Sequence, residues 1–228
     1  MIAANRRRWL AAAAASLLAP GVARSRDTPM YDYLSIELET APPGPALAAR
    51  LAAQATVIAS AGGEVLGVFT PQLGWHARQA AILLRWREAS GARDAVVAAL
   101  GGHRDRLTPT ARPSPTDRLK PGGVYVHRWF VIDTTSLDEF VALSTEGWKD
   151  FEARFDTKIF GLFAAEPSEA ERKAGRTRLL LLTRYADHGV WETSRDPSTA
   201  AMAAFMRRQK LTRDTWAAST LLAADQGA

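Results

Sequence analysis

From residue 30 onward the chain alternates apolar and polar side chains, as a half-buried β-strand does. A proline-rich turn ends this strand, and an amphipathic helical pattern then runs to the pair Gly62-Gly63. One face of the strand carries Leu34, Ile36 and Leu38, and the other carries Tyr31, Tyr33, Ser35 and Glu37. The elements predicted for this half are strands over 30–38, 64–70 and 79–87 and helices over 47–61 and 92–100.

The same order of patterns begins again at Val124. Thr135 with Asp138 and Ser136 with Glu139 have the spacing of a capping box, which predicts a helix start. The segment from Thr215 to Leu222 fits either a short closing strand or a helix. The elements predicted here are strands over 124–132, 158–164 and 178–185, and helices over 137–155, from about 188, and over 200–210.

The two halves match each other at a constant spacing. Leu66-Gly67-Val68-Phe69 corresponds to Phe160-Gly161-Leu162-Phe163, which lies 94 residues further on, and the same spacing pairs Tyr31 with Tyr125. An internal duplication of an α+β unit explains this match. The predicted division is a repeat over 30–100, a proline-rich linker over 101–123, a second repeat over 124–211 and a tail over 212–228.

Residues 1–23 have the composition of a signal peptide. Arg6, Arg7 and Arg8 precede an alanine-rich stretch, and the small residues Gly21 and Ala23 fit cleavage after Ala23. The apolar stretch is shorter than the roughly 20 residues that span a bilayer, although an uncleaved anchor is an alternative. The paired arginines resemble a twin-arginine signal, with Sec export as the other route. We expect a periplasmic or secreted protein with no stable membrane span after processing.

The amino-acid composition excludes some classes of site and partner. The chain has no cysteine, which excludes disulfides and thiolate sites. The net charge is +5, but the three arginines of the predicted signal account for more than half of it. No basic stripe with interleaved aromatics remains, so we expect no nucleic-acid partner.

Four segments of the second half, together with Trp148, resemble the NIPSNAP family. They are Tyr125-Val126-His127-Arg128-Trp129-Phe130, the helix start Leu137 to Phe140, the strand Lys158-Ile159-Phe160-Gly161-Leu162-Phe163, and Leu182-Thr183-Arg184-Tyr185. The match covers residues 124–210 well and the first half loosely. Their order and spacing carry the resemblance, since each motif alone is weak.

The resemblance implies two tandem ferredoxin-like repeats that form a pseudo-dimeric α/β barrel, with its sheets face to face and its helices outside. It implies no single activity. In the first repeat Leu34 replaces the strand arginine that corresponds to Arg128, and Gln54 replaces the tryptophan that corresponds to Trp148. The first half is therefore expected to be a structural partner.

The strand faces away from the helices would line the lumen of such a barrel. We hypothesise that His127 accepts a proton or contacts a ligand, that Glu37 orients it, and that Arg184 neutralises an acid group. The structural alternative is a hydrogen-bonded histidine, arginines in ion pairs and packed tryptophans. The further ligand-binding candidates on this face are Tyr33, Arg85, Tyr125 and Trp129.

Three function classes stay open: a small-molecule binding protein, a cofactor-independent or haem-dependent barrel enzyme, and an assembly module without catalysis. The sequence has no HExxH motif, phosphate loop or Gly-x-Ser-x-Gly elbow, and its four histidines lack ligand spacing. We therefore expect no metal and no cofactor, with haem as the alternative because related barrels bind it. The partners expected are a small organic ligand and, as an open alternative, a second copy of the chain.

Overall fold

The computed structural model describes residues 29–87 and 91–223. The predicted signal peptide lies outside these ranges. The first half contains β1 (Met30–Glu37), α1 (Gly44–Ser60), β2 (Gly63–Leu73), β3 (Gln79–Trp86), α2 (Gly91–Leu100) and β4 (His103–Pro109). The second half contains β5 (Val124–Asp133), α3 (Leu137–Arg154), β6 (Thr157–Ala165), α4 (Glu169–Lys173), β7 (Arg176–Tyr185), α5 (His188–Thr193), α6 (Ala200–Gln209) and β8 (Thr212–Leu222).

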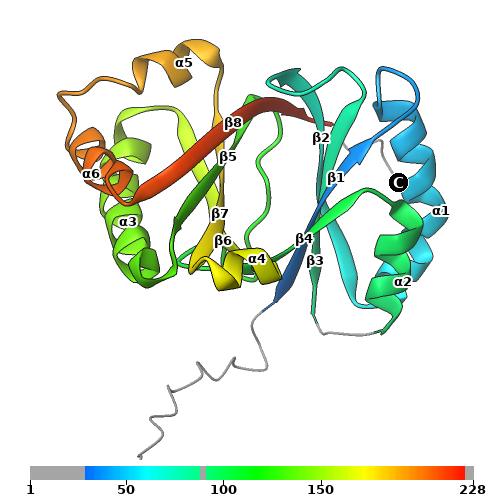
Figure 1. Cartoon of the computed structure of the whole chain (residues 1–228). Coiled ribbons are helices and arrows are strands. Elements are labelled where there is room, and N and C mark those ends of the chain that lie inside the picture. The colour runs from blue at the N-terminus through cyan, green and yellow to red at the C-terminus, as the bar shows by residue number, and fades with distance from the viewer. Residues whose placement is uncertain (1–28, 88–90, 224–228) are drawn as a thin grey trace, which may run out of the picture.

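The eight strands close into one antiparallel barrel in the order β1-β3-β2-β8-β5-β7-β6-β4. Within each half the last strand lies beside the first, as in a ferredoxin-like unit. The halves are joined where β4 pairs with β6 and β8 pairs with β2. Figure 1 shows α1 and α2 on one side of the barrel and α3 and α6 on the other. The predicted α+β fold with two ferredoxin-like repeats is confirmed.

The strands β4 and β8 correct the predicted boundaries of the repeats. Residues 103–109 were expected in a linker, but they form β4. Residues 212–222 of the expected tail form β8, which is the strand alternative given for that segment. The segment of β4 reads His-Arg-Asp-Arg-Leu-Thr-Pro, with Leu107 as its one large apolar residue. Backbone hydrogen bonds to β1 and β6 make this segment a strand. Backbone pairing does not require apolar side chains, so the sequence of β4 shows no apolar alternation.

Alternate strand residues separate two kinds of core. Leu34 and Ile36 pack with apolar residues of α1 and α2, whereas Tyr31 and Tyr33 belong to a cluster inside the barrel. Phe130 and Trp148 belong to the matching outer cluster of the second half. The faces assigned to the first strand are therefore correct, and the barrel interior is a third core between two sheet–helix layers. No helix in the described ranges has the length and hydropathy of a membrane span.

A glycine at equivalent places in β2 and β6 allows close packing inside the barrel. Both strands have a register shift there, next to Gly67 and Gly161. A Cβ on Gly67 would lie 2.5 Å from Leu119, and one on Gly161 would lie 2.6 Å from Pro113. The loop between β4 and β5 therefore packs against both glycines. This explains why the matching segments of the two halves share a glycine.

The predicted start of α3 is correct, but its predicted cap is not formed. Leu137 begins the helix, yet the Ser136 hydroxyl makes no capping hydrogen bond. A short 3₁₀ turn (Thr134–Ser136) precedes α3 instead. A complete capping box is found at Ser168 and Glu171, where it starts α4 in the hairpin between β6 and β7.

Candidate functional site

The lumen contains most of the predicted site residues. Tyr33, Tyr125, His127 and Trp129 are buried and lie on the interior face of the strands, as predicted. The Tyr33 hydroxyl lies 2.8 Å from His127 Nδ1. On the other side of the ring, His127 Nε2 lies 3.0 Å from the Thr220 hydroxyl. Both ring nitrogens are therefore hydrogen-bonded within the barrel.

The direction of these bonds fixes the tautomer of His127. The Thr220 hydroxyl donates its one hydrogen to the Tyr125 carbonyl, so it accepts from His127 Nε2. Nδ1 consequently accepts from the Tyr33 hydroxyl. Burial lowers the pKa of His127 to about 3 and raises that of Tyr33 well above its ordinary value, so both side chains are neutral at pH 7.

Glu37 does not orient His127, contrary to the prediction. Its side chain is 53% exposed at the end of β1, where it forms an ion pair with Arg78. The prediction failed because alternation gives the face of a residue but not its height along the barrel. The histidine is oriented instead by two hydroxyl groups, Tyr33 and Thr220.

The two arginines predicted to face the lumen, Arg85 and Arg184, each contact a carboxylate and a backbone carbonyl of the segment between β4 and β5. Arg85 pairs with Glu64 and donates to the Pro115 carbonyl. Arg184 donates to the Gly122 carbonyl and lies 3.3 Å from Asp156. This is the structural arrangement that was weighed as the alternative. Their ligand-binding role stays a prediction, as do the roles of Tyr33, Tyr125 and Trp129.

Aromatic rings fill the space around His127. The rings of Tyr33, Phe69 and Trp75 lie 5.6, 4.5 and 5.2 Å from it between centroids. A haem held by this histidine would need one free ring nitrogen and an open face beside it. Both ring nitrogens of His127 are hydrogen-bonded and three aromatic rings lie against it, so these residues do not fit the haem alternative. No group of three or more metal-binding side chains is found in the described ranges.

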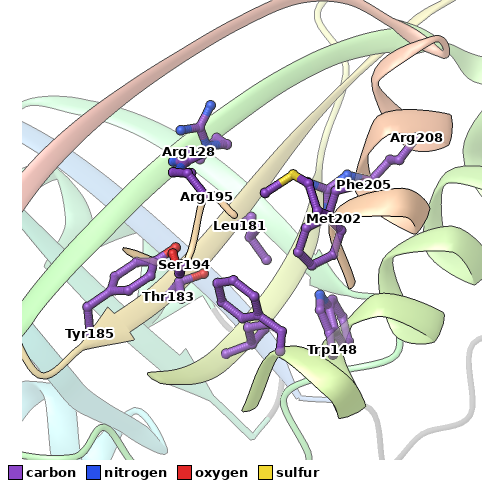
Figure 2. A pocket seen from close by; sticks show the side chains of 12 residues that line it. Arg128, Trp148, Leu181, Thr183, Tyr185, Ser194, Arg195, Met202, Phe205 and Arg208 are labelled. Carbon is purple, nitrogen blue, oxygen red and sulfur yellow. The ribbon is translucent and has the colours of Figure 1, made fainter. Parts of the chain in front are cut away.

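A second candidate site lies outside the lumen, between the outer face of β5, β6 and β7 and the helices α3 and α6. It is a small cavity of about 40 Å³ that opens to solvent. Figure 2 shows its side chains converging from the sheet, from α3, from α6 and from the segment between α5 and α6. The lining residues are Arg128, Trp148, Phe151, Ile159, Leu181, Thr183, Tyr185, Ser194, Arg195, Met202, Phe205 and Arg208.

Three guanidinium groups share this pocket without an acidic neighbour. Arg208 is 7% exposed and lies over the rings of Phe130, Phe140 and Phe205, 4.6 to 5.3 Å from their centroids. Its polar contact is with the Ser144 hydroxyl at 3.2 Å. Among residues 29–87 and 91–223, Arg128, Arg195 and Arg208 form no salt bridge.

The pKa shifts of these groups reflect their crowding. Burial, followed by the positive charge of Arg128, lowers the pKa of Arg208 to about 9. Burial and then the charge of Arg195 lower the pKa of Arg128. Burial raises the pKa of the Tyr185 phenol in the same pocket, against the opposing effect of the arginines. An anion bound among the three arginines would offset their mutual repulsion.

Trp148 adds a buried donor to the pocket. Its side chain is 2% exposed, and its indole N–H has no hydrogen-bond partner within the described ranges. A buried N–H without an acceptor lowers stability by about 1–3 kcal/mol. A ligand oxygen in the pocket would supply the missing acceptor.

The sequence predicted no site at this pocket, although it singled out two of the lining residues. Arg128 and Trp148 entered through the family resemblance, which also showed that Leu34 and Gln54 replace them in the first repeat. Arg195 and Arg208 were missed because no local motif contains them. They come from a loop and from the last turn of α6, so the charge cluster exists only after α6 packs on α3.

The fold is that of the dimeric α/β-barrel proteins, here with both halves in one chain. No protein-family model and no curated protein sequence matches the sequence of this chain. These comparisons therefore do not assign the chain to the NIPSNAP family.

Solved structures share the fold. A candidate monooxygenase from Lactobacillus acidophilus NCFM is 10% identical with a TM-score of 0.53, over 86% of this chain and 94% of that one. One from Fusobacterium nucleatum subsp. nucleatum is 9% identical with a TM-score of 0.54, over 87% and 94%. An anthrone oxidase-like protein is 10% identical with a TM-score of 0.53, over 88% and 93%. At such low identity the likeness establishes the architecture alone.

Proposed function

We propose that the protein binds a small organic anion in the pocket between its second sheet and the helices α3 and α6. One observation carries this proposal: Arg128, Arg195 and Arg208 line one cavity, and none has a carboxylate partner in the part of the chain that the structure describes. A buried charge without a counter-ion is unfavourable by several kcal/mol. A bound anion would remove that penalty, which favours this pocket as the ligand site.

The three arginines lie at different depths in the pocket and would contact the anion in turn. Arg195 is exposed and lies over the Trp191 ring, so it is placed to meet an incoming anion at the mouth. Arg128 is half-buried on β5, and Arg208 is buried on α6. Guanidinium groups suit this task because they stay charged and donate several hydrogen bonds in fixed directions.

Isothermal titration with small anions tests the proposal. The variant Arg128→Leu, which copies the first repeat, should weaken binding at least about tenfold, as expected for loss of one charged hydrogen bond. Arg78→Leu, which removes an exposed arginine of the first half, serves as the matched control and should bind as the unmodified chain does. Equal affinity of both variants would refute the proposed site.

The enzyme alternative has support from the pocket chemistry. Guanidinium groups beside a bound phenol stabilise its phenolate, the electron-rich form that reacts with O₂. The names of the similar structures, candidate monooxygenases and an anthrone oxidase-like protein, fit this chemistry. Oxidation of a ring CH₂ to a carbonyl would use one O₂ and release one water. Oxygen uptake with anthrone as the probe, lost in Arg128→Leu, tests it, and uptake no faster than in buffer discards it.

Export and the NIPSNAP resemblance complete the proposal. The signal-like residues 1–23 support a periplasmic or secreted binding protein of NIPSNAP type. N-terminal sequencing of the protein from a periplasmic fraction should begin at Arg24. Recovery of the full-length chain from the cytoplasm would contradict export.

A further inference from the structure

The first repeat contains a built example of anion binding between its sheet and its helices. Asp32 on β1 is fully buried and is held by Arg93 from α2 and Arg104 from β4. Its two oxygens accept four hydrogen bonds of 2.7 to 3.0 Å from these two guanidiniums. The pKa of Asp32 is lowered by these arginines against the opposing effect of burial. This layer of the fold therefore accommodates a planar carboxylate.

The second repeat has the cations of such an arrangement without the carboxylate. Val126 stands 94 residues after Asp32 and belongs to the outer apolar cluster. Arginines again come from a strand and from a helix, Arg128 on β5 and Arg208 on α6, and Arg195 adds a third. From this comparison, and on the basis of the proposed function, we infer that the pocket takes the carboxylate of a small aromatic acid.

The donors favour a carboxylate over a phosphate. Phosphate sites commonly use backbone N–H groups at the N-terminus of a helix, where the helix dipole is positive. Arg208 lies instead in the last turn of α6, at the negative end. Met202, in the first turn of α6, also lines the cavity, but its backbone N–H already donates to the Thr199 hydroxyl. A planar carboxylate matches the guanidinium fork. The indole N–H of Trp148 can donate to an oxygen of the same ligand.

The walls favour an aromatic body on the acid. Trp148, Phe151, Tyr185 and Phe205 line the cavity together with apolar side chains of β6 and β7. A small aliphatic acid would leave these rings without contact, whereas an aromatic ring gains edge-to-face packing. The cavity of about 40 Å³ has room for roughly three water molecules. The carboxylate therefore occupies the interior, and a single ring extends toward the mouth at Arg195.

Titration of the full mature chain with benzoate, acetate, inorganic phosphate and benzyl alcohol tests the inference. Benzoate should bind at least about tenfold more tightly than acetate or phosphate, since ring burial and the carboxylate both contribute. Trp148→Phe keeps a ring but removes the N–H, and it should weaken benzoate about fivefold. Thermal unfolding of each variant without ligand checks that it is folded. Arg208→Lys keeps a charge without the fork, and it should weaken benzoate and acetate by similar factors, because both present the same carboxylate.

The outcomes separate the inference from the proposed function. Binding of phosphate or acetate at least as tight as benzoate, with loss in Arg128→Leu, would overturn the aromatic acid and leave an anion site. Benzyl alcohol binding as tightly as benzoate would show that charge plays no part and would overturn both. No binding of any of the four probes would overturn the proposed function itself.

Discussion

His127 illustrates how the setting of one residue determines what it can do. Its two ring nitrogens belong to a chain of hydrogen bonds from Tyr33 through Thr220 to the Tyr125 carbonyl. Its lone pair at Nδ1 is engaged, and its neutral form is strongly favoured. In this setting the residue ties both halves of the barrel together, because Tyr33 and His127 lie on different repeats.

Replacement of His127 by Gln should remove part of the sensitivity of the fold to acid. The folded state keeps the ring neutral down to a pKa of about 3, whereas the unfolded chain takes up a proton near the ordinary histidine pKa of about 6.5. Stability is therefore lost as pH falls through the unfolded pKa, by about 2 kcal/mol between pH 7 and pH 5. Gln can keep both hydrogen bonds and does not titrate.

Urea unfolding at pH 7 and pH 5 measures this difference. The unmodified chain should lose about 2 kcal/mol more than His127→Gln over this range. His76→Gln, an exposed histidine in the turn between β2 and β3, is the matched control and should behave as the unmodified chain does. The same pH dependence for both variants would contradict a buried neutral His127.

At the scale of elements, the pocket depends on how α6 crosses α3. Gly147 stands at the closest approach, where an added Cβ would lie 2.4 Å from Cε1 of Phe205. Phe205 in turn packs against Phe151 and under the Arg208 guanidinium. The positions of Phe151, Phe205 and Arg208 in the pocket therefore depend on the absence of a side chain at Gly147.

Gly147→Ala should push the two helices apart. Overpacking at such a contact typically costs about 1–3 kcal/mol, which exceeds the gain in helix propensity of about 1 kcal/mol. We expect a lower midpoint of thermal unfolding together with weaker anion binding. Gly44→Ala, at a helical glycine with no atom within 4 Å of an added Cβ, should leave both unchanged or raise stability slightly. Equal behaviour of the two variants would show that the crossing tolerates a side chain.

The sequence predicted elements wherever an apolar period was present. The strands with alternating faces and the long helix α3 were correctly placed, because their patterns record burial against one layer. The strand β4 was missed because its outward-facing arginines form ion pairs, such as Arg106 with Asp94, and its interior face carries Asp105. The Asp105 carboxylate is compensated by Arg178 on β7, a contact that no local pattern can indicate.

At the scale of the molecule, neither half is complete alone. The edge strands β2 and β4 of the first repeat find their partners in β8 and β6 of the second. The aromatic interior is shared, since Tyr31 packs on Phe163 and Tyr33 on Trp129. Each half by itself would expose two strand edges and one apolar face.

A fragment of residues 124–223 should therefore associate with itself. Two copies can pair β8 of one with β6 of the other and close a barrel, as dimeric α/β-barrel proteins do. Light scattering with size-exclusion chromatography should give twice the mass of the fragment, or aggregation. A stable monomeric fragment would contradict the need for closure. The full chain is the control, and it closes its barrel without a second copy.

Covalent joining of the two halves has a consequence for how the protein can change. In a barrel made from two identical chains, every substitution appears twice, so a cation cluster gained on one side is also gained on the other. Here Leu34 and Arg128 occupy matching places and differ. One half could thus keep its buried charges paired, as Asp32 is with Arg93 and Arg104, while the other took on unpaired charge. Any loss of stability from that unpaired charge occurs once per molecule.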